Sequence, residues 1–165
     1  MITLSSYLCG EWREGTGVNA TLENPSTGDK IAQCTSSGLD LKASLAYARD
    51  VGGPALRAMT FAQRGALLKR MSAALHDNRE ALIDVSIENA GATRGDAKFD
   101  IDGGIGTLAF YARLGETLGD RTFLVEGAGE NLTRSPRFAG YHVKVPRTGA
   151  AIHINAFNFP VWGLA

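Results

Sequence analysis

The sequence has few cysteines and no metal-binding pattern. Cys9 and Cys34 are the two cysteines among 165 residues, and neither has metal-ligand spacing or a histidine close by in sequence. A catalytic thiolate needs an electropositive setting, so we expect both thiols to be small packing residues. We also expect no disulfide between them and no metal site in this chain.

The sequence also lacks an excess of charge of either sign and has no long apolar run. Seventeen basic residues balance seventeen acidic ones, which argues against a nucleic acid or an anionic membrane as partner. No apolar stretch reaches the roughly 18 residues of a membrane span. The N-terminal stretch MITLSSYLCGEWREG has neither the basic nor the apolar region of a secretory signal. We therefore expect a cytoplasmic globular protein.

Glycine and proline divide the chain into four regions that together predict an α/β fold. Residues 7–34 contain short β-like runs around the turn Asn24-Pro25-Ser26-Thr27-Gly28, which predicts a β-hairpin arm. Residues 39–118 have a helical pattern. Residues 121–147 return to strands, RTFLVEG and YHVKV, and residues 149–165 start a strand-to-helix crossing.

Helix start and stop signals stand out in the helical region. Thr60 and Gln63 form a capping-box pattern, Asn78 is placed to cap a second helix that Gly91 ends, and Thr93 with Asp96 begins a third. We expect Arg79, Glu80, Asp84 and Glu88 to stay in solvent. The apolar positions expected to be buried are Leu67, Leu68, Met71, Leu75, Leu82, Ile83 and Val85.

Residues 104–109, GIGTLA, match the G-x-G-x-x-A pattern of a dinucleotide-binding loop. Such a loop follows a strand that is buried on both faces. The preceding residues instead include Asp96, Lys98, Asp100 and Asp102, and the apolar residues around them recur at helical spacing. We therefore expect a helix that packs closely at its glycines.

The run HINAFNFPVWG, residues 153–163, has the pattern of a strand that leads into a helix. Ala150 to Ile154 form an apolar stretch typical of a parallel strand, and Pro160 suits the first turn of a helix. In open α/β sheets, ligands bind at such crossings. Asn158 is therefore either an amide donor to a ligand or the cap of the helix. His153 is expected to be a packing residue.

Residues 149–160, GAAIHINAFNFP, resemble the first nucleotide-fold strand of the aldehyde dehydrogenase superfamily. That family usually has proline and tryptophan at the positions of Ala156 and Phe157, so the difference points to a subgroup. With GGPALRAMTFAQRGALLKRM, TRGDAKFDIDGGIGTLAFYARLG and SSGLDL, the chain is similar to the aldehyde dehydrogenase domain of bifunctional phenylacetate-degradation (oxepin-CoA ring-opening) enzymes. The semialdehyde dehydrogenases of aerobic benzoyl-CoA degradation are the subgroup that the chain resembles next.

The resemblance implies a fold and a site. The chain would be the N-terminal part of an aldehyde dehydrogenase fold: a β-hairpin arm, a helical layer, oligomerisation strands and the first strand of the nucleotide-binding sheet. Asn158 would help form the oxyanion hole. Residues Ile154, Asn155, Ala156 and Phe157 would line NAD(P), with NADP favoured by the subgroup. The substrate would be an aldehyde, CoA-linked in this subgroup, and the enzyme a homo-oligomer.

The resemblance also implies what this chain does not contain. In the family, a cysteine thiolate attacks the aldehyde, hydride passes to NAD(P)+, and the thioester is hydrolysed. Neither cysteine has the family's Gln-Lys-Cys setting, and the general-base glutamate and Lys-Pro motifs are missing. We therefore expect an N-terminal fragment that is inactive alone. The alternative from another class is a non-catalytic helical binding module.

Overall fold

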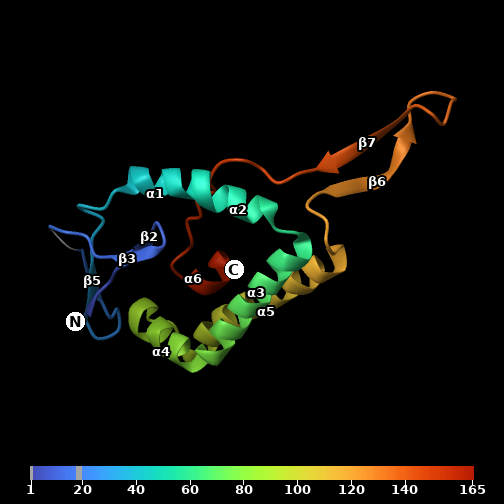
Figure 1. Ribbon diagram of the computed structural model, residues 1–165. Coiled ribbons are helices and arrows are strands. Elements are labelled where there is room, and N and C mark those ends of the chain that lie inside the picture. The colour runs from blue at the N-terminus through green and yellow to red at the C-terminus, as the bar shows by residue number, and fades with distance from the viewer. Residues whose placement is uncertain (1, 18–19) are drawn as a thin grey trace.

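Two long antiparallel helices, α3 (Phe61–Asp77) and α5 (Arg94–Leu118), form the centre of the structure (Figure 1). The computed structural model describes residues 2–17 and 20–165. A shorter helix, α4 (Arg79–Ala90), connects the two at one end. Opposite this layer runs a second row of α1 (Leu41–Tyr47), the π-helix η1 (Ala48–Gly52) and α2 (Gly53–Ala58).

Most of the predicted helix boundaries are confirmed. The Thr60 amide donates to Gln63 Oε1 at 2.9 Å, and the Gln63 amide donates to Thr60 Oγ1 at 3.2 Å, which completes the capping box. Thr93 caps α5 by accepting from the Asp96 amide, and Gly91 ends α4 with a φ of 64°. Asn78 occupies the predicted N-cap position of α4, but its side chain makes no capping bond there, because its amide donates back to the Ala74 carbonyl of α3.

Glycines let α3 and α5 approach each other at the backbone. A Cβ on Gly115 would lie 2.6 Å from the Phe61 carbonyl oxygen, and one on Gly65 would lie 2.7 Å from that of Ala112. Further along, the buried Ser72 hydroxyl donates to the Ile105 carbonyl at 2.9 Å. The helix predicted over the G-x-G-x-x-A pattern is confirmed, because residues 104–109 lie inside α5 and are no phosphate loop.

A cluster of buried hydrophobic side chains joins α4 to α5. Ile83, Ala97 and Ile101 are fully buried there, with Leu82 and Ile105 packed against them. The expected burial of Val85 is wrong, since it is 58% exposed and lies on the face of α4 that turns toward the N-terminal strands. Met71 is likewise 47% exposed.

The N-terminal region forms a small sheet and a separate hairpin. Strands β4 (Ala20–Glu23) and β5 (Lys30–Cys34) pair antiparallel, and β1 (Ile2–Thr3) adds in parallel to β5. The Asn24 side chain accepts from the amides of Ser26 and Thr27, which stabilises the predicted turn. Strands β2 (Ser6–Leu8) and β3 (Glu11–Arg13) form the separate hairpin.

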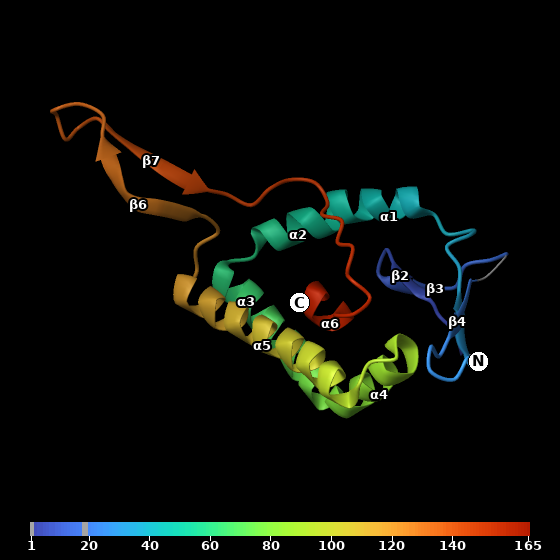
Figure 2. The same ribbon diagram turned by 180° about the vertical axis from the view of Figure 1, so that it is seen from behind.

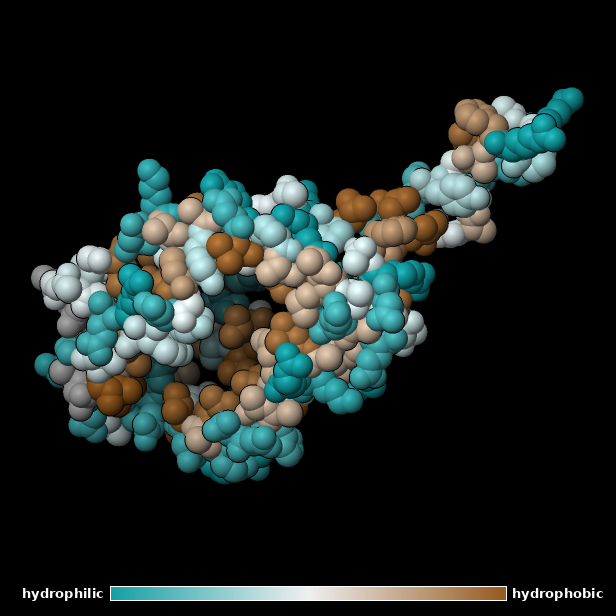
Figure 3. Space-filling model, viewed as in Figure 1, coloured by the Kyte–Doolittle hydropathy of each residue, from teal (hydrophilic) through white to brown (hydrophobic). Residues whose placement is uncertain are grey.

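A second hairpin, β6 (Leu124–Asn131) and β7 (Ala139–Lys144), projects away from the helices (Figures 1 and 2). Its two faces differ in polarity. Val125 pairs with Val143 on one face, whereas Glu126 pairs with His142 on the other, where Lys144 also bonds to Glu126 at 2.7 Å. Hydrophobic atoms at the base of the hairpin are visible at the surface in Figure 3.

The strand predicted for residues 150–154 is not formed. The segment has no regular secondary structure, is exposed and belongs to no sheet among the described residues. A strand requires a neighbour that pairs with its amides and carbonyls, and none lies beside this segment here. The chain then turns and ends in α6 (Pro160–Leu164), where Pro160 occupies the expected first turn. Both views place α6 inside the space between the two helical layers (Figures 1 and 2).

We expect Asp102→Asn to destabilise the protein slightly at neutral pH. Asp102 pairs with Arg79 at 2.6 Å, and this hydrogen bond lowers the pKa of the Asp102 carboxyl. Because the pKa is depressed in the folded state, the pair stabilises the protein above the unfolded pKa, about 3.9. That stabilisation is lost as the pH falls through the folded pKa. The effect is small because Asp102 is half exposed.

Unfolding of wild type and Asp102→Asn at neutral and acidic pH measures this effect. The difference between the two proteins should shrink as the pH falls. A difference that stays constant over that range would contradict the assigned ion pair.

Candidate functional site

Asn158 lies in a turn immediately before α6, at the edge of a cleft of about 600 Å³. Residues 155–158 form one side of this cleft. The opposite side comes from β4, its turn and the end of α4. The lining residues are Thr21, Leu22, Glu23, Pro25, Asn89, Ala90, Asn155, Ala156, Phe157, Asn158 and Pro160. A volume of this size lies within the range of ligand sites, roughly 300–1,000 Å³.

The structure decides against Asn158 as the cap of α6. The residue at the cap position is Phe159, and its side chain makes no capping hydrogen bond. The first free amides of α6 instead donate to Asp100 of α5, from Val161 N at 3.1 Å and from Trp162 N at 2.8 Å. Asp100 is 1% exposed, so a buried carboxylate satisfies this helix end. Asn158 is exposed, and its side-chain amide remains available for another partner.

Aromatic contacts hold α6 against α5 on the same side. Phe99, Phe159 and Trp162 meet edge to face, with ring centroids 5.2–6.3 Å apart. The Trp162 indole also donates to Thr107 Oγ1 at 3.0 Å. Gly103 makes room for the indole, because a Cβ there would lie 2.6 Å from the ring. The turn with Asn158 is therefore followed by a well-anchored helix.

The residues expected to line the cofactor are only partly brought together. Asn155, Ala156 and Phe157 line the cleft with Asn158, whereas Ile154 is 93% exposed and is not among its lining residues. Phe157 is 95% exposed despite its position at the cleft. Asn155 is half-buried near Gly163 of α6. His153 is exposed, so the packing role expected for it is wrong.

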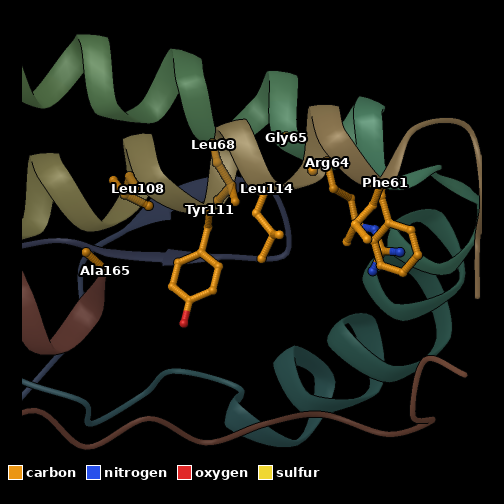
Figure 4. Close-up of a pocket in the computed structure, with 10 residues that line it drawn as sticks. Phe61, Arg64, Gly65, Leu68, Leu108, Tyr111, Leu114 and Ala165 are labelled. Carbon is orange, nitrogen blue, oxygen red and sulfur yellow. The ribbon is translucent and has the colours of Figure 1, made fainter. Parts of the chain in front are cut away.

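A second cavity, of about 320 Å³, lies along α3 and α5 and is mostly apolar. Figure 4 shows Tyr111 and Leu114 pointing from α5 into this space and Arg64 lying beside Phe61. The Arg64 guanidinium carbon is 4.6 Å from the Phe61 ring centroid, a cation–π distance. This cavity offers apolar contact, one cation and the Tyr111 hydroxyl, but its lining includes no carboxylate side chain, histidine or cysteine.

Both cysteines are half-buried free thiols outside the cleft. Cys9 has a φ of 54° in the turn between β2 and β3, and its sulfur lies 4.0 Å from Ser44 Oγ. Cys34 ends β5. The geometry gives neither thiol a role beside Asn158.

Residues 12–165 match the model of the aldehyde dehydrogenase family. The chain therefore belongs to the aldehyde dehydrogenase family, as the resemblance predicted. Its fold is an α/β arrangement that recurs in solved aldehyde dehydrogenases. No described helix is long and apolar enough to span a membrane.

A curated relative is 3,4-dehydroadipyl-CoA semialdehyde dehydrogenase of Aromatoleum evansii, 44% identical over 98% of this chain. The chain spans 31% of that relative's length. Among solved structures, aldehyde dehydrogenase 21 of Physcomitrella patens covers 82% of the chain with a TM-score of 0.68 and 20% identity; the match takes in 27% of that protein. The NAD-dependent benzaldehyde dehydrogenase of Corynebacterium glutamicum covers 76%, with a TM-score of 0.64 and 21% identity, and also matches over 27% of its length.

The role of Asp100 was missed from the sequence. Asp100 stands between Asp96 and Asp102 and had the pattern of a solvated charge. The available signal was helical spacing, since Asp100 follows Ala97 by three residues and precedes Gly104 by four, on the buried face of α5. That signal does not show which backbone amides the carboxylate would meet.

Proposed function

We propose that the whole protein is an NAD(P)-dependent aldehyde dehydrogenase in which Asn158 forms part of the oxyanion hole. The observation that carries this proposal is a family match through Asn158, with the residue exposed in an anchored turn at a cleft. Its side-chain N–H would donate to the aldehyde oxygen as that oxygen gains negative charge. A preorganised donor of this kind lowers the barrier without reorganising during the reaction.

Residues 155–157 are proposed to line the cofactor, which accepts the hydride when bound; Ile154 lies outside the cleft and is not given this role. Asn155, Ala156 and Phe157 fit this role because they line a cleft of suitable size. Their backbone groups belong to no sheet, so they are free to contact a ribose. Such contacts tolerate the Ala156 and Phe157 side chains. We favour NADP over NAD from the subgroup resemblance.

The substrate that we propose is a CoA-linked semialdehyde from the breakdown of an aromatic acid. The name of the relative from Aromatoleum evansii, a CoA semialdehyde dehydrogenase at 44% identity, supports this class. The two candidates are the semialdehyde of phenylacetate degradation and that of benzoyl-CoA degradation. Family membership favours an enzyme over a helical binding module.

We also propose how the four regions serve a longer chain. Residues 7–34 would be its arm, 39–118 its helical layer, 121–147 its oligomerisation strands and 149–165 the start of its cofactor-binding fold. This chain alone would be inactive, because neither cysteine lines the cleft at Asn158. A cytoplasmic location agrees with the two free thiols.

Formation of NAD(P)H by the purified whole protein tests the function. The two candidate CoA semialdehydes and a CoA-free aldehyde of similar length are each supplied with NAD+ or NADP+. We expect turnover with a CoA semialdehyde and a higher kcat/KM with NADP+. No aldehyde-dependent reduction of either nucleotide would overturn the proposed activity, and equal turnover of the CoA-free aldehyde would overturn the substrate class.

The whole protein is further proposed to be a homo-oligomer that assembles through β6 and β7. Val125, Tyr141 and Val143 are 45–59% exposed on one side of this projecting hairpin. An exposed apolar strand surface of this kind invites pairing with another chain. A second copy of the protein is the partner that we propose.

We expect Val143→Lys to reduce the size of this assembly, because it places a charge on the apolar face of the hairpin. His142→Lys, on the polar face, is the matched control and should leave the assembly intact. Light scattering on size-separated samples at micromolar concentration measures the mass. A monomeric wild type, or equal masses for both variants, would contradict the proposed interface.

A further inference from the structure

We propose that Asp100 is a positioning residue for Asn158, and this inference rests on the proposed function. The buried carboxylate holds the start of α6, and through it the turn that presents the Asn158 amide. Asp100 would touch neither substrate nor cofactor. Its effect on turnover would pass through the geometry of Asn158.

The contacts of Asp100 are specific to the start of α6. Its two oxygens accept from two successive amides, Oδ2 from Val161 at 3.1 Å and Oδ1 from Trp162 at 2.8 Å. The carboxylate is 1% exposed, so water does not replace either bond. Hydrogen bonds to a charged acceptor are about twice as strong as neutral ones. Together with the Phe99 ring contact and the Thr107 bond, the Asp100 side chain therefore holds the start of α6.

Helix α6 depends on such anchors because it has five residues. A helix of this length is unstable without tertiary contacts. The negative carboxylate at its N-terminal end also interacts favourably with the helix dipole. Loss of the carboxylate would leave two partly buried amides without a strong acceptor.

Asn158 lies three residues before Val161, so the anchor is close to the proposed donor along the chain. Phe159 and Pro160 separate them, and both are restrained. Proline fixes its own φ, and the Phe159 ring contacts Phe99 and Trp162. A shift of α6 would therefore be transmitted to the Asn158 amide rather than absorbed between them. Misplacement of about 1 Å can cost around 100-fold in rate.

The variant Asp100→Asn tests this role in the whole enzyme, because it keeps the shape and removes the charge and one acceptor. We expect kcat to fall about 10- to 100-fold, with little change in the KM for the nucleotide. Asp102→Asn, two residues further along the same helix and paired with Arg79, is the matched control. It should keep the wild-type kcat.

A double-mutant comparison separates positioning from general stability. If Asp100 acts through Asn158, Asp100→Asn should cause no further loss of kcat once Asn158 is alanine. A purely structural role would lower kcat by the same factor in both backgrounds. Full additivity, or an unchanged kcat in Asp100→Asn, would overturn the inference.

A second variant covers the case in which Asp100→Asn does not fold. Thr107→Val removes the acceptor of the Trp162 indole and loosens α6 from the same helix. We expect Thr107→Val to lower kcat by less than Asp100→Asn does, and to cause no further loss when Asn158 is alanine. The same loss of kcat in both backgrounds, or no loss in either, would overturn the positioning role. A wild-type enzyme without aldehyde oxidation would instead refute the proposed function, which distinguishes the two failures.

Discussion

Replacement of Asn158 by alanine in the whole enzyme is expected to lower kcat by about 10²–10³. The side-chain amide would donate to the aldehyde oxygen most strongly when that oxygen becomes an alkoxide. Its loss therefore raises the energy of the transition state more than that of the bound substrate, so kcat falls while the nucleotide KM stays close to wild type. Initial-rate measurements of NAD(P)H formation give both constants.

Asn89→Ala is the matched control for this prediction. Asn89 lines the same cleft from α4 and has no proposed role in the reaction. Its replacement should leave kcat unchanged, which would separate loss of a donor from a general change in the cleft. Wild-type turnover in Asn158→Ala would remove Asn158 from the oxyanion hole. Thermal unfolding of each variant shows whether it remains folded.

The second large effect is expected from Gly115→Ala. Its new methyl carbon would lie 2.6 Å from the Phe61 carbonyl oxygen and 2.9 Å from the Gly65 Cα. Both neighbours are backbone atoms, so relief requires α3 and α5 to separate. Overpacking of this kind costs about 1–3 kcal/mol, and the lost contact between the helices adds to it. We expect a clear fall in Tm.

Gly106→Ala, on the same helix, is the control that should not lower Tm. A methyl group there meets no atom within 4 Å. Alanine in a helix interior is favoured over glycine by about 1 kcal/mol, so Tm should rise or stay the same. Both variants and wild type are compared at one scan rate, because large proteins often unfold irreversibly. Equal Tm values for the two variants would contradict the close crossing of α3 and α5.

Local signals in the sequence predicted the helices more accurately than the sheet. The Thr60 capping box, the Thr93 cap and the Gly91 stop each depend on a few neighbouring residues, and all three are confirmed. Residues 150–154 were wrongly predicted as a strand, because a strand depends on pairing partners that are often distant in sequence. Asn78 shows a related limit of local signals, because it lies between the end of α3 and the start of α4. Its side chain bonds to a carbonyl of α3 and does not cap α4.

The sequence predicted which residues belong to the candidate site, but not the contacts that hold them in place. The family match supports the identity of the fold, and the turn at Asn158 follows from the proline at 160. The partner of the helix start could not be foreseen, because Asp100 lies 61 residues before Val161. Spacing alone left Asn158 open as a cap. The contact with Asp100 removes that alternative and leaves the amide of Asn158 for a proposed ligand.

The fit between Gly103 and Trp162 limits how this gene can recombine with its relatives. The indole occupies the space that any side chain at position 103 would need, and 59 positions separate the two residues. A crossover within residues 121–147 would join the helical layer of one parent to α6 of another. A chimera that joined Trp162 to a parent with a side chain at position 103 would place that side chain against the indole. Libraries built by domain shuffling should therefore carry residues 103 and 162 as one linked unit.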